Sequence, residues 1–168
     1  MKNFDQEIDR IKEKLSQVID GYAGYSTPTE SSRTDQNLRN FLRKKLGSIL
    51  QQFPEIIAID QKKADPKIND NYARVISGIE LLLCTLENSC CADKSFYKKI
   101  AEQPEILLQI YRSDQQLVEQ TEIMADELKQ LSNGFDETEL IEILYHCYDQ
   151  TDGINQILTE REFLFVNE

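Results

Sequence analysis

Residues 72–86 read Y-A-R-V-I-S-G-I-E-L-L-L-C-T-L and predict the helix around which the fold is organised. At 3.6 residues per turn, seven apolar side chains of this stretch share one broad face. They are Tyr72, Val75, Ile76, Ile79, Leu82, Leu83 and Leu86. Cys84 and Leu81 fall outside this face. Gly78 lowers helix propensity by about 1 kcal/mol relative to alanine, but it allows a neighbouring backbone to approach closely. We therefore expect other helices to pack around residues 72–86.

The composition of the whole chain favours an all-α fold. The 168 residues are 40% hydrophobic and 29% charged, with six glycines and four prolines. Few glycines and prolines, with abundant Leu, Ile, Gln, Glu and Lys, are typical of helices and not of a turn-rich sheet. A chain of this length fits one domain. We expect a single helical domain over residues 1–168, an irregular antiparallel bundle of about six helices.

Apolar periodicity predicts where the other helices lie. They cover Asn3–Asp20, Arg33–Phe53, Lys94–Gln103, Pro104–Leu131, Glu137–Asp149 and Ile154–Phe163. Pro54 either ends the second helix or opens a short one. Ser113 marks a kink or break in the long helix, and Thr151-Asp152-Gly153 predicts a turn before the last one. Asp136 followed by Glu139 is close to a capping box.

Two further patterns bear on helix ends and on packing. The polar stretch 62–70, which contains Pro66, predicts a loop, and Asn69 or Asp70 can cap the helix after it. In the long helix, Ile110, Leu117, Met124 and Leu131 recur every seven residues, the spacing of a packed helix pair. Asp114 and Thr121 interrupt this apolar seam.

The charge is distributed unevenly. The total of −11 combines about +2 over residues 1–100 with about −13 over residues 101–168. An acidic C-terminal third repels phosphate backbones and anionic lipids, so we expect neither a nucleic-acid nor a membrane partner. It suits a basic protein partner or a solvated surface. The basic cluster Arg39, Arg43, Lys44 and Lys45 fans around a helix and forms no single stripe.

Targeting signals and thiols indicate a cytoplasmic protein. The first ten residues are charged and contain no apolar signal core. No apolar run approaches the roughly 20 residues that span a bilayer. Four cysteines in such a chain are expected to be reduced thiols.

A distinctive loop, residues 21–32, joins the first two expected helices. It reads G-Y-A-G-Y-S-T-P-T-E-S-S, and Ser31 or Ser32 can cap the helix that follows. With Arg33-Thr34-Asp35 and Leu38-Arg39, this region resembles the N-terminal pattern of a family of short bacterial helical proteins. That pattern is G-Y-x-G-Y, an Arg-Arg pair, an Asp and a Leu-Arg, and the family has no established activity. The resemblance covers about 20 residues. Ser32 stands in place of the first arginine of the pair, which puts any role of paired arginines in doubt.

The residues of this region can also be interpreted without the resemblance. Tyr22 and Tyr25 would pack as anchors whose hydroxyls seek partners. Asp35 and Arg39 are four apart, the spacing of a helical ion pair. One interpretation is a structural corner that locks two antiparallel helices, and we favour it. The other is a binding loop that presents the tyrosines and Arg33, with Asp35 and Arg39, to a partner.

No metal or catalytic motif is evident. Zinc sites commonly use C-x2-C or H-x3-H pairs, and neither spacing occurs. The residues that a metal site would have to use are His146, Cys147, Cys91 and Glu142. Glu142 and His146 are four apart, whereas di-iron bundles use Glu-x-x-His. A boundary histidine with buried free thiols is the simpler interpretation. We expect no cofactor, no metal and no catalytic residue.

The functional hypothesis is a non-enzymatic cytosolic helical-bundle protein that acts through protein–protein interaction, with a homodimer as one form. The 21–32 loop and the acidic C-terminal helices are the surfaces that it would use. The alternative is a small metal-dependent or small-molecule-binding helical enzyme that uses His146, Glu142 and nearby cysteines.

Overall fold

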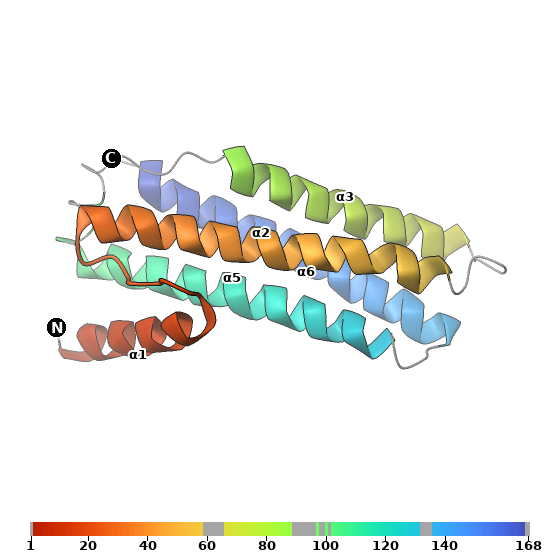
Figure 1. Cartoon of the computed structure of the whole chain (residues 1–168), viewed down its shortest axis with the longest axis horizontal. Helices are drawn as coiled ribbons and strands as arrows, with labels where there is room; N and C mark the ends of the chain where they lie inside the picture. The colour runs from red at the N-terminus through yellow and green to blue at the C-terminus, as the bar shows by residue number, and fades with distance from the viewer. Residues whose placement is uncertain are drawn as a thin grey trace. The chain divides into compact units, whose positions relative to one another are not determined.

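The structure is a computed structural model, and the regular secondary structure of its described residues is helical. It describes residues 2–58, 66–88, 97, 100, 102–131 and 136–166. The helices, coloured along the chain in Figure 1, are α1 (Lys2–Val18), α2 (Pro28–Ala58), α3 (Pro66–Asn88), α5 (Pro104–Leu131) and α6 (Glu137–Val166). The described residues contain no strand. The all-α class is therefore confirmed, and the described residues form five long helices where about six were expected for the chain.

The chain divides into two compact units. Unit 1 comprises Met1–Leu42, Ser89–Val118 and Ile157–Glu168, and unit 2 comprises Arg43–Asn88 and Glu119–Gln156. The helices α2, α5 and α6 each contribute to both units. Each unit thus joins segments that are far apart in the sequence. A single domain over the whole chain remains a prediction.

The helix α2 begins earlier than the expected Arg33. Pro28 occupies its first position, where the missing N–H costs nothing. The Thr27 hydroxyl accepts a hydrogen bond from the Glu30 N–H at 3.3 Å and donates one to the Glu30 carboxylate at 3.1 Å. Thr27 and Glu30 therefore cap the helix in the T-x-x-E pattern. The expected cap at Ser31 or Ser32 was wrong, because both residues lie inside α2.

Two more prolines begin helices. Pro66 is the first residue of α3 and Pro104 the first of α5. The loop expected around Pro66 was therefore wrong from that residue onward, and Asn69 and Asp70 lie within α3. Pro54 neither ends α2 nor opens a new helix, since α2 continues to Ala58.

The turn expected at residues 151–153 does not form, and α6 is continuous across it. Buried residues follow one another at alternating steps of four and three along α6, which is one face of a helix. They are Leu140, Leu144, Cys147, Thr151, Ile154, Leu158 and Arg161. Thr151 is 3% exposed, and its hydroxyl donates to the Tyr148 carbonyl oxygen at 2.7 Å. Burial of this stripe outweighs the local turn preference of Thr-Asp-Gly.

The helix α5 is likewise unbroken at Ser113. The four heptad positions from Ile110 to Leu131 are all buried, as expected. Asp114 and Thr121, which interrupt the apolar pattern, are themselves 0% exposed. These two polar residues therefore belong to the interior and do not interrupt the helix.

The helix α3 packs on one side only. Ile68, Val75, Ile79, Leu82 and Leu86 are buried, while Ala73, Arg74, Ser77 and Glu80 are exposed. Leu81 and Cys84 are exposed, as their positions outside the apolar face predicted. The helix is thus one wall of unit 2 and not a rod enclosed by the others. Within unit 2 the segments of α2, α3, α5 and α6 alternate in direction along the chain (Figure 1).

In unit 1, the connection after α1 gives α1 and α2 a relative direction that was not expected. Figure 1 shows α1 and α2 running the same way, with the connecting segment returning along them. The antiparallel pair expected on either side of this loop was therefore wrong. A return segment of this kind needs many residues, which accounts for the length of the connection.

The cap expected at the start of α6 is present. The Asp136 carboxylate accepts hydrogen bonds from the N–H groups of Thr138 at 2.8 Å and Glu139 at 2.9 Å, and the Asp136 N–H donates to the Glu139 carboxylate.

Most of the helix expected over 94–103 lies outside the described residues. Two residues of that stretch, Tyr97 and Ile100, are described and buried.

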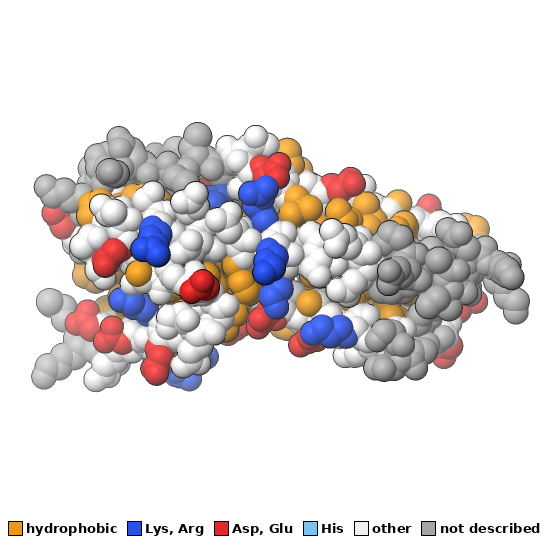
Figure 2. Space-filling view, in the orientation of Figure 1, with side chains coloured by type: hydrophobic (Ala, Val, Ile, Leu, Met, Phe, Trp, Pro, Cys, Tyr) orange, Lys and Arg blue, Asp and Glu red, His pale blue; other side chains and the backbone are white. Residues whose placement is uncertain are grey.

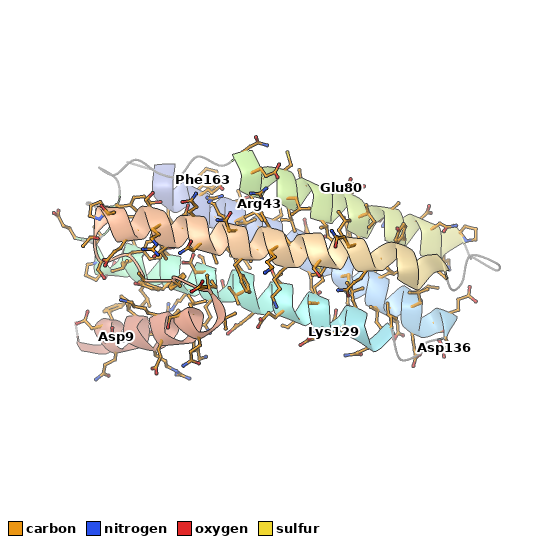
Figure 3. All side chains as sticks on the ribbon, viewed as in Figure 1. Asp9, Arg43, Glu80, Lys129, Asp136 and Phe163 are labelled. Carbon is orange, nitrogen blue, oxygen red and sulfur yellow. The ribbon has the colours of Figure 1, made fainter. Side chains whose placement is uncertain are left out.

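The face of the molecule shown in Figure 2 carries charges of both signs. Lys and Arg side chains are interspersed with Asp and Glu on the face shown in Figure 2, and Figure 3 labels exposed residues such as Asp9, Glu80 and Phe163. No helix in the described part of the chain is long and apolar enough to cross a membrane.

The close approach expected at Gly78 occurs in unit 2. A Cβ atom there would lie 2.6 Å from the Thr151 hydroxyl oxygen and 3.0 Å from its Cβ. We predict that Gly78→Ala destabilises the protein by about 1–3 kcal/mol through this overlap. Gly47, also inside a helix, has nothing within 4 Å of such an atom. Gly47→Ala should instead stabilise by about 0.5–1 kcal/mol. Urea unfolding of both variants measures the difference, and equal stabilisation by the two would rule out the tight helix contact.

Candidate functional site

Two glycines shape the loop between α1 and α2 in unit 1. Gly21 and Gly24 have φ angles of 73° and 86°, which side chains with a Cβ rarely adopt. A Cβ at Gly24 would also overlap the Tyr111 hydroxyl oxygen. That oxygen accepts a hydrogen bond from the Tyr25 N–H at 3.0 Å, and Asn37 Nδ2 donates to the Gly21 carbonyl oxygen at 2.9 Å. The loop backbone is thereby held against α2 and α5.

Both loop tyrosines point inward to one carboxylate. Tyr22 is 4% exposed and Tyr25 is 1% exposed. Their hydroxyls donate to Asp114 Oδ2 at 2.7 Å and 2.6 Å. The rings of Tyr22, Tyr25 and Tyr111 meet edge to face, with centroids 5.3–6.4 Å apart. Asp114, in the interior of α5, is therefore the point to which the loop attaches.

The charge of Asp114 is balanced by Arg161 from the last turns of α6. Arg161 is 1% exposed, and its Nε donates to Asp114 Oδ1 at 2.6 Å. Its Nη2 donates to the Tyr25 hydroxyl oxygen at 2.9 Å and lies 2.7 Å from Asp35 Oδ1. A single guanidinium thus joins the loop, α2, α5 and α6 within unit 1.

The remaining charges of this site come from α2 and α6. Arg39 Nε donates to Asp35 Oδ2 at 2.9 Å, the ion pair that the spacing of four predicted. The same guanidinium contacts Glu162 Oε1 at 3.4 Å. We call Tyr22, Tyr25, Asp35, Arg39, Tyr111, Asp114 and Arg161 the buried charge cluster. It contains two carboxylates and two guanidiniums, so its net charge is zero.

The two carboxylates of the cluster differ in their electrostatics. Burial raises the pKa of Asp114 above its usual value, although Arg161 and the two tyrosine hydroxyls oppose the shift. Burial acts on Asp35 in the same direction, but Arg161 and Arg39 outweigh it and lower its pKa. Asp35 is held between two guanidiniums and is therefore the more firmly ionised of the pair.

The tyrosines of the cluster resist ionisation. Burial, and next the charge of Asp114, raise the pKa of Tyr22 and of Tyr25 well above the usual value. Burial also raises the pKa of Tyr111. The phenols are consequently fixed as hydrogen-bond donors or acceptors and are poorly placed to act as bases.

The structure brings together four of the five residues singled out in the binding hypothesis. Tyr22, Tyr25, Asp35 and Arg39 all lie in the buried charge cluster, whereas Arg33 is exposed on α2 and apart from it. In this conformation the four buried side chains contact other parts of unit 1. These contacts are those of a structural anchor, and a binding role for these residues remains untested.

Asp114, Tyr111 and Arg161 were not recognised from the sequence as members of a site. Two of them carried a signal. Asp114 falls on the apolar seam of α5, and Arg161 continues the buried stripe of α6 after Leu158. A charged residue at a position that periodicity assigns to the interior indicates a partner of opposite charge nearby.

Two residues of the alternative metal site, Glu142 and His146, line one pocket together with Glu127. His146 has a side chain that is 63% exposed, with Nδ1 3.8 Å from Glu127 Oε1. Cys147 is buried, and burial, followed by the charge of Glu127, raises the pKa of its thiol to about 12. Cys91 lies outside the described residues. Among the residues that the structure describes, no group of three or more His, Cys, Asp or Glu side chains is placed to hold a metal ion.

Comparisons with protein-family models, with curated proteins and with solved structures found no match to this chain.

The buried charge cluster should be essential for folding. We predict that Arg161→Met costs about 3–5 kcal/mol of unfolding free energy. It leaves Asp114 buried without its cation and removes one of the two cations beside Asp35. Arg43 forms a 2.5 Å pair with Glu87, but both side chains are over 40% exposed. Arg43→Met, the matched control, should therefore cost less than about 1 kcal/mol. Chemical unfolding of both variants measures this, and similar costs would mean that the cluster contributes no more than a surface pair.

Alkaline pH should unfold the protein as the cluster tyrosines ionise. An unfolded tyrosine has a pKa of about 10, and the folded pKa values of Tyr22 and Tyr25 lie well above it. Their contribution to stability is therefore complete below about pH 10 and is lost as the pH rises further. Tyrosinate absorbance, followed with circular dichroism, should show these two phenols ionising together with helix loss. Full ionisation of all seven tyrosines with the helices intact would contradict the burial.

Proposed function

We propose that this chain is a non-enzymatic helical protein that acts through protein–protein contact in the cytoplasm. Its partner contributes an amphipathic helix with basic flanks, which docks on a groove between α3 and α6 in unit 2. The free thiols of Cys84 and Cys147 are consistent with a reducing compartment.

The observation that carries this proposal is an apolar groove, here called the α3–α6 groove. It has a volume of about 420 Å³ and is lined by Ala73, Arg74, Gly78, Leu81, Tyr148, Thr151 and Asp152, among others. Its floor is formed where Gly78 meets Thr151. An apolar groove between two helices is the kind of surface that can receive an amphipathic helix.

Large apolar side chains on this face are exposed. Leu81 is 56% exposed, Tyr148 37% and Tyr145, one turn before Tyr148, 55%. Single exposed apolar residues are ordinary on protein surfaces, but Leu81 and Tyr148 line the same groove, which favours an interaction site. Arg74 lies 5.9 Å from the centre of the Tyr148 ring, so this tyrosine is already positioned. Tyrosine and leucine in such a setting provide contact area for an apolar helix face.

The charge near the groove selects the partner. Asp152 lines it, the one lining cation, Arg74, lies over the Tyr148 ring, and Asp149 directly follows Tyr148 in the sequence. Residues 137–156 of α6 carry five acidic side chains and no lysine or arginine. A partner helix with lysine or arginine beside its apolar stripe would complement this surface and would associate faster at low salt.

The test of the groove uses two exposed apolar residues of unit 2. A photo-crosslinking amino acid at position 81, in the groove, should capture one partner, whereas the same amino acid at Ile123, 46% exposed on α5, should not. With that partner purified, Leu81→Asp should weaken binding by about tenfold or more, and Ile123→Asp by less than about twofold. Equal crosslinking or equal weakening at both positions would contradict the proposal.

The identity of the crosslinked partner also shows which molecule occupies the groove. A second copy of this chain, detected as a crosslinked dimer, would replace the proposed partner helix by self-association.

The same purified protein can be used to test the alternative function, a metal-dependent or small-molecule-binding enzyme. That alternative predicts that EDTA or added zinc shifts the melting temperature through Glu142 and His146, which line a pocket of about 360 Å³ with Glu127. We expect no shift.

A further inference from the structure

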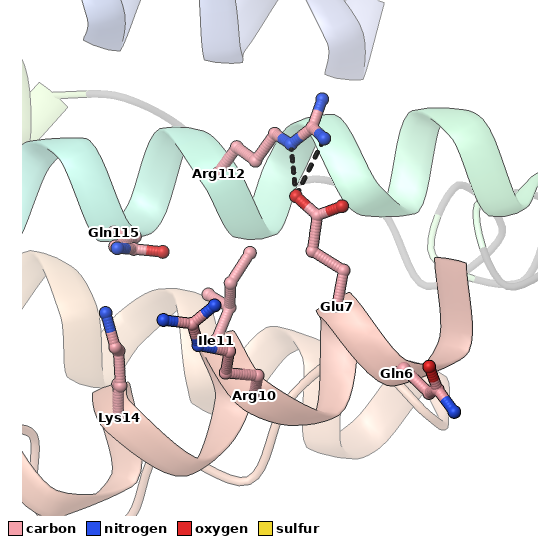
Figure 4. Close-up of a pocket in the computed structure, with 7 residues that line it drawn as sticks. All are labelled: Gln6, Glu7, Arg10, Ile11, Lys14, Arg112 and Gln115. Atoms are coloured by element: carbon pink, nitrogen blue, oxygen red, sulfur yellow. Dashed lines mark hydrogen bonds and ion pairs between the residues drawn. The ribbon is translucent and has the colours of Figure 1, made fainter. Parts of the chain in front are cut away.

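A second pocket, in unit 1, has the opposite chemistry to the α3–α6 groove. It lies between α1 and α5 and has a volume of about 430 Å³, within the range of small-molecule sites. Six of its lining residues are polar or charged, and Figure 4 shows how they lie. They are Gln6, Glu7, Arg10 and Lys14 of α1 with Arg112 and Gln115 of α5. Three cationic side chains thus line the pocket, against one carboxylate among its described residues.

The carboxylate of this pocket is already engaged. Glu7 Oε1 accepts from Arg112 Nε at 2.8 Å and lies 2.7 Å from its Nη2, the contacts drawn in Figure 4. Arg10 and Lys14 sit one turn apart on α1 and form no ion pair with any described residue. The pocket therefore carries a net positive charge of two that the described part of the chain does not neutralise.

This local charge contrasts with the chain as a whole. A net charge of −11 repels anions from the molecule in general. An anion would consequently bind only where several cationic side chains converge. Guanidinium groups suit oxyanions because their planar N–H donors match two oxygens at once, and an ammonium adds a compact charge.

We propose that this pocket binds a small multivalent oxyanion, a compound with two or more phosphate or carboxylate groups. Arg10 and Lys14 contact one anionic group, and Arg112 contacts the other. Glu7 occupies Arg112 in the absence of the ligand and competes with it. The site is separate from the α3–α6 groove, so the two proposals stand or fall independently.

Isothermal titration at low salt, with inorganic pyrophosphate and with citrate as probes, tests this site. We expect saturable binding of one molecule per chain to at least one probe, and the tighter probe tells phosphate from carboxylate chemistry. The double variant Arg10→Gln/Lys14→Gln should bind at least about tenfold more weakly. Arg33→Gln/Lys44→Gln removes the same charge from exposed residues outside the pocket. It should change binding by less than about twofold, because neither side chain lines the pocket.

A third variant distinguishes a binding pocket from a merely structural ion pair. Glu7→Gln frees Arg112, so it should tighten binding of the same probe by about threefold or more. Absence of saturable binding for both probes overturns the proposal, as does equal weakening by the two double variants. Weaker binding in Glu7→Gln would also overturn it, because the carboxylate would then support the site and not compete for it. Circular dichroism confirms that each variant is folded.

Discussion

A guanidinium that is cut off from water must be matched by anions and acceptors, and Arg161 imposes this constraint on unit 1. Its partners come from three other segments: Asp35 from α2, Asp114 from α5 and the Tyr25 hydroxyl from the loop. Moving any of these segments away would leave a buried charge without its partner, which is far more costly than losing an apolar contact. The cluster therefore determines where the loop and the helix ends must lie.

Such a cluster contributes specificity more than net stability. Removing four charges from water costs several kcal/mol per ion, and good geometry largely offsets this cost without a large surplus. What it supplies is a unique arrangement, because Asp114 accepts from Arg161 and from two tyrosines at once. This arrangement accounts for the two glycines with positive φ, which let the loop run beside Tyr111 and bring both phenols inward. These polar groups are used internally, whereas the residues of the α3–α6 groove and of the basic pocket beside α1 line open pockets.

Periodicity predicted the class of fold and much of the core, whereas the ends of the helices and their continuity depended on packing. The heptad in α5, the apolar face of residues 72–86 and the cap at Asp136 followed from local patterns. The Thr27–Glu30 cap also had a local signal, the T-x-x-E pattern, but Ser31 and Ser32 were expected to cap the helix in its place. By contrast, Thr-Asp-Gly in α6 is a turn sequence, and the helix continues because the stripe that includes Thr151 is buried, with Thr151 against Gly78. The pairing of Asp114 with Arg161 joins residues far apart in sequence, so no spacing rule could have assigned them to each other.

The most direct test of this account is the NMR signal of the Arg161 side chain, assigned with an Arg161→Lys variant. We predict a slowly exchanging Nε–H proton at neutral pH, together with observable hydroxyl protons of Tyr22 and Tyr25, because buried hydrogen-bonded protons exchange slowly with water. The exposed Arg33 provides the reference for rapid exchange. An Arg161 Nε–H that exchanges as fast as that of Arg33, with no tyrosine hydroxyl signal, would contradict the buried charge cluster on which the account depends.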